Sequence, residues 1–269
     1  MVGRMSSIAN AQLSTARSLG KTALSKVPQI TIAFWIVKIF ATTLGETGGD
    51  ALSMTLNLGY AISTLIFLAI FAASLAGQLS TSRYHPTLYW LVVVATTTVG
   101  TTTSDYLDRT LGLGYVKSSI ILFGAVIAVL LIWRAVSGTI AADRITTPTN
   151  EFFYWLTILV SNTLGTALGD FAATSTGLGF ERGALVFGAL LAVVAGAHFF
   201  TKIPGAVLFW AAYVLTRPLG ATLGDTLTKS HAAGGLNLDR ISSSIVIAIV
   251  MAIIVATTTL RDRVPEPAA

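Results

Sequence analysis

Residues 35–50 read WIVKIFATTLGETGGD, and the pattern of this stretch occurs four times along the chain. Tryptophan, glycine, aspartate and a second glycine follow one another as W-x9-G-x4-D-x8-G, with no change of spacing between copies. The shared positions are the tryptophans Trp35, Trp90, Trp155 and Trp210, the first glycines Gly45, Gly100, Gly165 and Gly220, and the aspartates Asp50, Asp105, Asp170 and Asp225. Because four of the five tryptophans fall in this register, the repeat is the unit of structure.

The four copies form two unlike pairs. The second and fourth copies carry a base four residues after the aspartate, Arg109 and Lys229, where the first and third carry Met54 and Thr174. This alternation predicts two halves, residues 28–142 and 143–260, that each contain one pair of repeats. The Thr- and Pro-containing stretch 137–150 is the predicted joint between them, and residues 1–27 and 261–269 are predicted to be tails.

The composition is that of an integral membrane protein. Of the 269 residues, 54% are hydrophobic and 11% are charged, and the mean hydropathy is +0.76, whereas a soluble domain carries roughly 25% charge. Each repeat contains two apolar runs close to the roughly 20 residues that a spanning helix needs. We therefore predict an all-α fold with eight transmembrane helices, at 29–48, 57–77, 87–105, 114–134, 151–169, 178–198, 205–224 and 241–260.

The distribution of basic residues predicts the orientation in the membrane. With eight spans both termini share one side, and lysine and arginine are more numerous on that side, as in the basic segment 1–27. The positive-inside rule then predicts that both termini lie on the cytoplasmic side of the membrane. Segment 1–27 is interpreted as an amphipathic helix on the membrane surface or as a flexible tail. The net charge of +5 is attributed to topology, so no nucleic-acid partner is expected.

The repeated aspartates are the candidate ion site, because ionisable groups inside a membrane are costly and usually mark an ion path. Neighbouring threonines add oxygen donors, and oxygen ligands without cysteine favour hard cations such as Mn²⁺, Mg²⁺ or Ca²⁺. The predicted cation-binding set is Asp50, Asp105, Asp170, Asp225, Glu46, Thr47, Thr102, Thr166 and Thr222. Within it, Asp50, Glu46 and Asp170 are predicted to ligate the metal, and Glu46 makes the site asymmetric. The alternative is that each aspartate only ends or caps a helix.

Lys38 and Arg217 lie well inside predicted spans, where a charge is expensive unless it is paired. Arg217 stands eight residues before Asp225 and is predicted to pair with an aspartate of a neighbouring repeat. Lys38 is the second predicted charge-pairing residue, and it lies close enough to the cytoplasmic end for its ammonium to reach the interface. The tryptophans are interpreted as interface anchors or packing residues rather than as a ligand cage.

The tandem order of Trp, then T/N-x-x-G-x4-D, then L-G-[YF] resembles a bacterial membrane-protein family defined by a repeat of unknown function. That resemblance covers residues 28 to about 260 and implies four tandem repeats of two spans each, with no agreed activity. The fourth copy departs from it, with Pro218 and the stretch GGLNLD in place of the common residues. In addition, GETGGD at 45–50 is similar to the E-x-G-D signature of manganese and calcium exchangers, which ranks those metals first.

These observations favour secondary transport of a hard, divalent cation. A cation channel with a pseudo-fourfold ring of aspartates is one alternative, and a non-transporting scaffold or binding protein is another. We find no P-loop, G-x-S-x-G or H-E-x-x-H motif, so no enzyme and no covalent cofactor is predicted. The expected partners are the lipid bilayer and the cation, and self-association into a homo-oligomer is left open.

Overall fold

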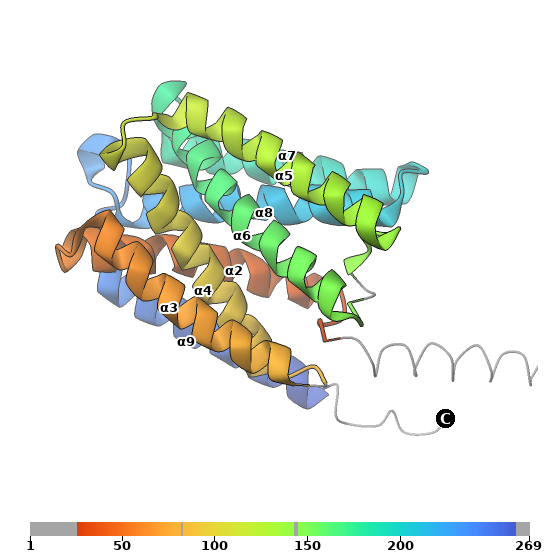
Figure 1. The fold of residues 1–269 in the computed structure, drawn as a ribbon. Helices are drawn as coiled ribbons and strands as arrows, with labels where there is room; N and C mark the ends of the chain where they lie inside the picture. The colour runs from red at the N-terminus through yellow and green to blue at the C-terminus, as the bar shows by residue number, and fades with distance from the viewer. Residues whose placement is uncertain (1–25, 82, 143–144, 262–269) are drawn as a thin grey trace, which may run out of the picture.

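The fold was taken from a computed structural model, which describes residues 26–81, 83–142 and 145–261. Most of the two predicted tails, residues 1–25 and 262–269, lies outside the described residues, as does the predicted amphipathic helix. The described part of the chain is helical, as its composition predicts, and eight long helices account for most of it (Figure 1).

Each repeat contributes one inner and one outer helix. The inner helices carry the tryptophans and aspartates and are α2 (Ile32–Asp50), α4 (Pro86–Asp105), α6 (Pro148–Asp170) and α8 (Gly205–Thr228). The outer helices follow them and are α3 (Gly59–Ser80), α5 (Tyr115–Ser137), α7 (Gly179–Phe200) and α9 (Arg240–Arg261). All eight predicted segments therefore coincide with helices, and their ends differ by a few residues.

Local sequence explains where these helices begin. Pro86 and Pro148 occupy the first turn of α4 and α6, where proline sacrifices no internal hydrogen bond. The Thr31 hydroxyl caps α2 by accepting from the Phe34 backbone N–H at 3.3 Å. Three of the turns into the outer helices pass through a glycine with positive φ, a conformation that side chains with a Cβ disfavour. They are Gly59 at 74°, Gly114 at 74° and Gly179 at 76°.

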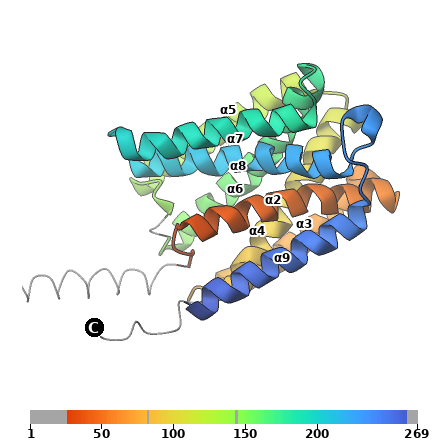
Figure 2. The same ribbon diagram turned by 180° about the vertical axis from the view of Figure 1, so that it is seen from behind.

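The four inner helices form a closed ring in the order of the chain. Helix α2 packs on α4, α4 on α6, α6 on α8, and α8 returns to α2. Each outer helix covers the inner helix of the following repeat: α3 lies on α4, α5 on α6 and α7 on α8. The last outer helix, α9, lies along α2 and so closes the cycle, as Figure 2 shows. The tandem repeat thus becomes a pseudo-fourfold bundle.

The first glycine of each repeat lets neighbouring inner helices touch. A Cβ built on Gly45 would lie 2.5 Å from Thr97 Cβ, and one on Gly100 would lie 2.8 Å from the Asn162 backbone carbon. The other two glycines meet the equivalent residue of the next inner helix, which stands seven residues after the tryptophan. Gly165 meets Arg217 in this way, and Gly220 meets Thr42. Small residues at such crossings allow the backbones of membrane helices to pack closely.

Replacing Gly100 with alanine is expected to lower the free energy of unfolding by about 1–3 kcal/mol, because the new methyl group meets backbone atoms of α6 that cannot rotate away. Unfolding of the purified protein in mixed detergent micelles measures this loss. Gly124→Ala is the matched control, since nothing lies within 4 Å of a Cβ at that position. Equal stability of the two variants would contradict the close-packing role of Gly100.

The tryptophans belong to a ring of eight aromatic side chains at the end of the bundle opposite the aspartates. Each tryptophan packs on the aromatic residue before it and on the equivalent residue of the preceding repeat, with ring centroids 5.1–5.9 Å apart. The members are Phe34, Trp35, Tyr89, Trp90, Tyr154, Trp155, Phe209 and Trp210. Trp90, Trp155 and Trp210 are buried, so the packing interpretation holds and the interface-anchor interpretation is wrong for these three.

The outer helices present an apolar surface. Leu65, Ile120, Leu185 and Ile253 are examples of large side chains that are more than half exposed on α3, α5, α7 and α9. In the part of the chain that the structure describes, six helices are long and apolar enough to cross a membrane, namely the four outer helices, α6 and α8. The protein is therefore a membrane protein, as predicted, with spanning helices built from internal repeats.

The fourth repeat departs from the others where its sequence does. Helix α8 contains Pro218 and runs to Thr228, and a short 3₁₀ turn, His231–Ala233, precedes α9. Asn237 has a φ of 55°, close to the 56° of Asn57 in the first repeat, so NLD at 237–239 replaces NLG at 57–59 in the turn. The Asp239 carboxylate accepts from the Ser242 backbone N–H at 2.7 Å, and this hydrogen bond lowers the pKa of Asp239.

Candidate functional site

The four aspartates lie at one level of the bundle, near the ends of the inner helices, and all four are buried. Asp50, Asp105 and Asp170 are the last residues of α2, α4 and α6, and each is followed by one π-helical turn, Ala51–Thr55, Tyr106–Thr110 or Phe171–Ser175. None of these three side chains caps a helix. The capping part of the alternative is therefore wrong for them, whereas each of the three does end its helix, as that alternative stated. Wide π turns often occur at functional sites.

The bases of the second and fourth repeats join the aspartates in two pairs. Arg109 Nε lies 3.0 Å from Asp105 Oδ1, and its Nη2 lies 3.2 Å from Asp170 Oδ2 in the next repeat. In the same way Lys229 Nζ lies 3.0 Å from Asp225 Oδ1 and 2.7 Å from Asp50 Oδ2. The alternation of bases in the sequence thus gives the aspartate level a pseudo-twofold pattern of ion pairs.

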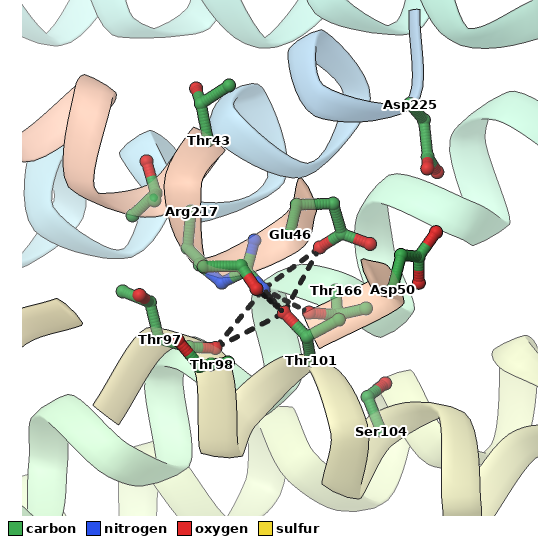
Figure 3. A network of polar contacts seen from close by, with 12 residues as sticks. Thr43, Glu46, Asp50, Thr97, Thr98, Thr101, Ser104, Thr166, Arg217 and Asp225 are labelled. Atoms are coloured by element: carbon green, nitrogen blue, oxygen red, sulfur yellow. Dashed lines mark hydrogen bonds and ion pairs between the residues drawn. The ribbon is translucent and has the colours of Figure 1, made fainter. Parts of the chain in front are cut away.

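One level deeper, side chains from all four inner helices meet at Arg217 (Figure 3). Its Nη2 lies 3.0 Å from Glu46 Oε2 of α2 and donates to the hydroxyls of Thr101 on α4 and Thr166 on α6, the latter at 2.7 Å. Arg217 is fully buried and Glu46 is nearly so. The predicted pairing of Arg217 is confirmed, but its partner is Glu46 rather than an aspartate, because the side chain reaches across the ring.

Three acids form what we call the acid cluster: Glu46, Asp50 and Asp225. One carboxylate oxygen of each lies within 4.8 Å of the others, and all three residues are buried. The predicted metal ligands Asp50 and Glu46 are brought together, but the third acid of the cluster is Asp225, and Asp170 is not part of it. The reason is the ring closure, which makes the first and fourth repeats neighbours and places the first and third across the ring.

The predicted threonine ligands have different positions. Thr166 contacts Arg217, as does Thr101, which the predicted set omitted. Thr102 and Thr222 stand one repeat position after Thr101 and Thr166. Each donates to a carbonyl oxygen in the preceding turn of its own helix. Thr47 accepts a hydrogen bond from Ser244 of α9 at 2.8 Å. Among the described residues, none of the four predicted threonines donates a hydrogen bond to the acid cluster, whereas Thr101 donates to Glu46 Oε2 at 3.3 Å.

Lys38 does not reach the interface. Its side chain is fully buried, and Nζ lies 4.2 Å from the centre of the Tyr213 ring. Within the described chain, Nζ has no hydrogen-bond partner and no carboxylate at ion-pair distance. The predicted charge pairing of Lys38 is wrong, and so is the prediction that its ammonium reaches the interface. The reason is that the ring of eight aromatic side chains closes that end of the bundle above Lys38.

Several functional residues were missed from the sequence alone. Arg109 and Lys229 hold the aspartates, and their spacing of four residues on a helix was a visible signal. Arg240, at the start of α9, lies 3.5 Å from Asp50 Oδ2 and has no repeat signal. Tyr213, next to Lys38, reads from the sequence as an ordinary apolar-span residue.

A comparison with protein families matches the chain four times. A family model described as Repeat of Unknown Function (DUF347) matches residues 33–84, 88–139, 153–203 and 208–263. The chain belongs to this family. Each match covers one inner helix and the outer helix after it, so the family repeat is the structural repeat and the expected resemblance is confirmed. No curated protein and no solved structure matches the chain.

Proposed function

We propose that this DUF347 protein is a secondary transporter of a hard, divalent cation, Mn²⁺, Mg²⁺ or Ca²⁺, in the bacterial inner membrane. The observation that carries the proposal is the acid cluster, three buried carboxylates within 4.8 Å of one another. Asp50 Oδ1 has no hydrogen-bond partner within the described chain, although it is buried. Oxygen atoms of this kind are the ligands that hard cations prefer.

The internal bases supply a mechanism for release. Lys229 holds Asp50 and Asp225, and Arg217 holds Glu46, so the cluster is already compensated by positive charge. A cation that binds the three acids must displace these bases, because like charges repel strongly in a medium of low dielectric constant. The base-paired and cation-bound forms are then two states of one site, whose populations depend on ion concentration.

We further propose that all eight helices span the membrane with both termini in the cytoplasm. Helices α2 and α4 hold positions in the ring equivalent to those of α6 and α8, which are apolar enough to span. The polar residues that reduce the hydropathy of α2 and α4, such as Lys38 and Thr101, are buried against other inner helices. Polar side chains of spanning helices usually face the bundle interior in this way.

A transporter fits the geometry better than a channel. The Arg217 guanidinium takes up the place where the four inner helices meet, with donors to three of them. A ring of aspartates around an open pore would instead leave the centre to water and ions. Conduction therefore requires a change of conformation, which is the property of a carrier.

Flux assays on reconstituted vesicles test the proposal. Wild type is expected to carry Mn²⁺ into vesicles loaded with a fluorescent indicator, with saturation and a dependence on the imposed pH or ion gradient. Asp225→Asn is expected to reduce the initial rate at least tenfold, because it removes one of three ligands. Asp105→Asn is the matched control, since Asp105 is equally buried and paired with a base but lies outside the acid cluster.

Three results would contradict the proposal. Absence of flux of Mn²⁺, Mg²⁺ and Ca²⁺ through correctly inserted wild type would favour a scaffold or binding protein. Flux that saturates only at high concentration would favour a channel. Equal loss in Asp225→Asn and Asp105→Asn would show that the acid cluster is not the ion site.

A further inference from the structure

A second set of buried polar side chains includes Arg217 and extends from it towards the ring of eight aromatic residues. It consists of Lys38, Asn162, Tyr213 and Arg217, all with no exposed surface, and we call it the donor cluster. Lys38 Nζ lies against the face of Tyr213, and Tyr213 is one helical turn before Arg217 on α8. Asn162 occupies the same repeat position on α6 as Arg217 does on α8.

Most polar atoms of the donor cluster have no partner among the described residues. Lys38 Nζ, Tyr213 Oη, and Arg217 Nε and Nη1 are free to donate, and Asn162 Oδ1 is free to accept. The Asn162 amide nitrogen is already bound to Thr96 Oγ1 at 3.1 Å. Buried polar groups are nearly always hydrogen-bonded, because a group left unpaired loses its hydration without gaining a partner. These four free donors lie on two neighbouring inner helices, α2 and α8, and indicate a ligand that accepts hydrogen bonds.

The charges of the donor cluster do not balance. Arg217 and a protonated Lys38 are both cationic, and among the described residues the acid at ion-pair distance from either is Glu46, which lies against Arg217 Nη2. A water molecule would satisfy a donor but would leave the ammonium of Lys38 uncompensated in a medium of low dielectric constant. An anion would satisfy both the donors and the charge.

We propose that the donor cluster binds one small monovalent anion, a halide or a carboxylate of similar size. Lys38 Nζ, Tyr213 Oη and the free edge of the Arg217 guanidinium are its donors. Phe209 packs on Tyr213 with ring centroids 5.6 Å apart, so the donor cluster adjoins the ring of eight aromatic residues. Anion binding does not depend on which cation the protein carries.

The test is the thermal unfolding of purified protein in detergent, followed by tryptophan fluorescence at constant ionic strength. Chloride, bromide, formate and acetate are each titrated against gluconate, an anion too large for the site. A saturable rise of the unfolding midpoint is expected for wild type. Comparison of the halide titrations with the carboxylate titrations then shows which class of anion the site binds. Lys38→Met is expected to abolish the rise, while Lys117→Met, which removes an exposed lysine of α5, retains it.

A second variant keeps the proposal testable if Lys38→Met does not fold. Tyr213→Phe removes one donor and retains the ring, and the loss of one hydrogen bond of about 1 kcal/mol weakens anion affinity about fivefold. The proposal is overturned if the midpoint is the same in chloride, formate and gluconate, which would mean that the cluster holds water or a neutral Lys38. It is also overturned if Lys38→Met and wild type respond equally.

Discussion

Arg217→Met is expected to lower the free energy of unfolding by about 3–5 kcal/mol, the largest stability loss of any single substitution in the inner ring. The variant leaves Glu46 buried without its cationic partner, and an unpaired buried charge is more costly than the pair itself. Thr101 and Thr166 also lose the donor that joins them. Unfolding in mixed detergent micelles measures the loss.

The double variant Glu46→Gln with Arg217→Met separates the charge effect from packing. Because both charges leave together, most of the stability is expected to return, as buried ion pairs replaced by neutral residues of similar volume are often neutral or stabilising. Arg182→Met, at an exposed position of α7, is expected to change stability by less than about 0.5 kcal/mol. A double variant as unstable as Arg217→Met alone would mean that packing against Gly165, and not the ion pair, makes Arg217 important.

The spacing of the repeat was enough to predict the helices but not their neighbours. Trp and Asp are separated by the same number of residues in all four copies. Because each residue adds a constant rise along a helix, the four carboxylates lie at one level of the bundle. The closed ring could not be read in this way, since the contact between α8 and α2 joins segments far apart in the sequence, such as Lys229 and Asp50, 179 residues apart. The sequence therefore predicts Asp170 as a metal ligand, whereas the aspartate beside Asp50 and Glu46 in the structure is Asp225.

Single departures from the repeat were informative when their side chains were long. Glu46 and Arg217 each replace a small or polar residue of the other copies, and the two meet across the ring. Lys38 shows the limit of the same reasoning. Its position near one end of α2 suggested an exposed ammonium, but whether that end is open depends on aromatic residues from all four repeats. Burial at that end is a property of the assembled ring and has no local signal.

Lys229→Met is expected to strengthen binding of Mn²⁺ at the acid cluster at least tenfold, a gain of about 1.4 kcal/mol. The lysine ammonium lies 2.7 Å from Asp50 Oδ2 and 3.0 Å from Asp225 Oδ1, so it occupies two of the three proposed ligands. Without the positive charge of Lys229, the negative charges of Asp50 and Asp225 are less neutralised in the cation-free protein. Added cation then restores stability in proportion to its affinity, because ligands that bind only the folded state stabilise it by mass action.

Arg109→Met is the matched control because Arg109 joins Asp105 to Asp170 in the same way, without a third acid beside them. Both variants lose a base that pairs with two buried aspartates, and both are expected to unfold at lower temperature than wild type. Only Lys229→Met is expected to regain the difference when Mn²⁺ is titrated at constant chloride. If Mn²⁺ raises the midpoint of both variants equally, the cation binds by general attraction to unpaired aspartates and Glu46 adds nothing. If it raises neither, the bases are permanent structural partners and the competition mechanism fails, whereas recovery of Lys229→Met alone identifies its ammonium as the competitor.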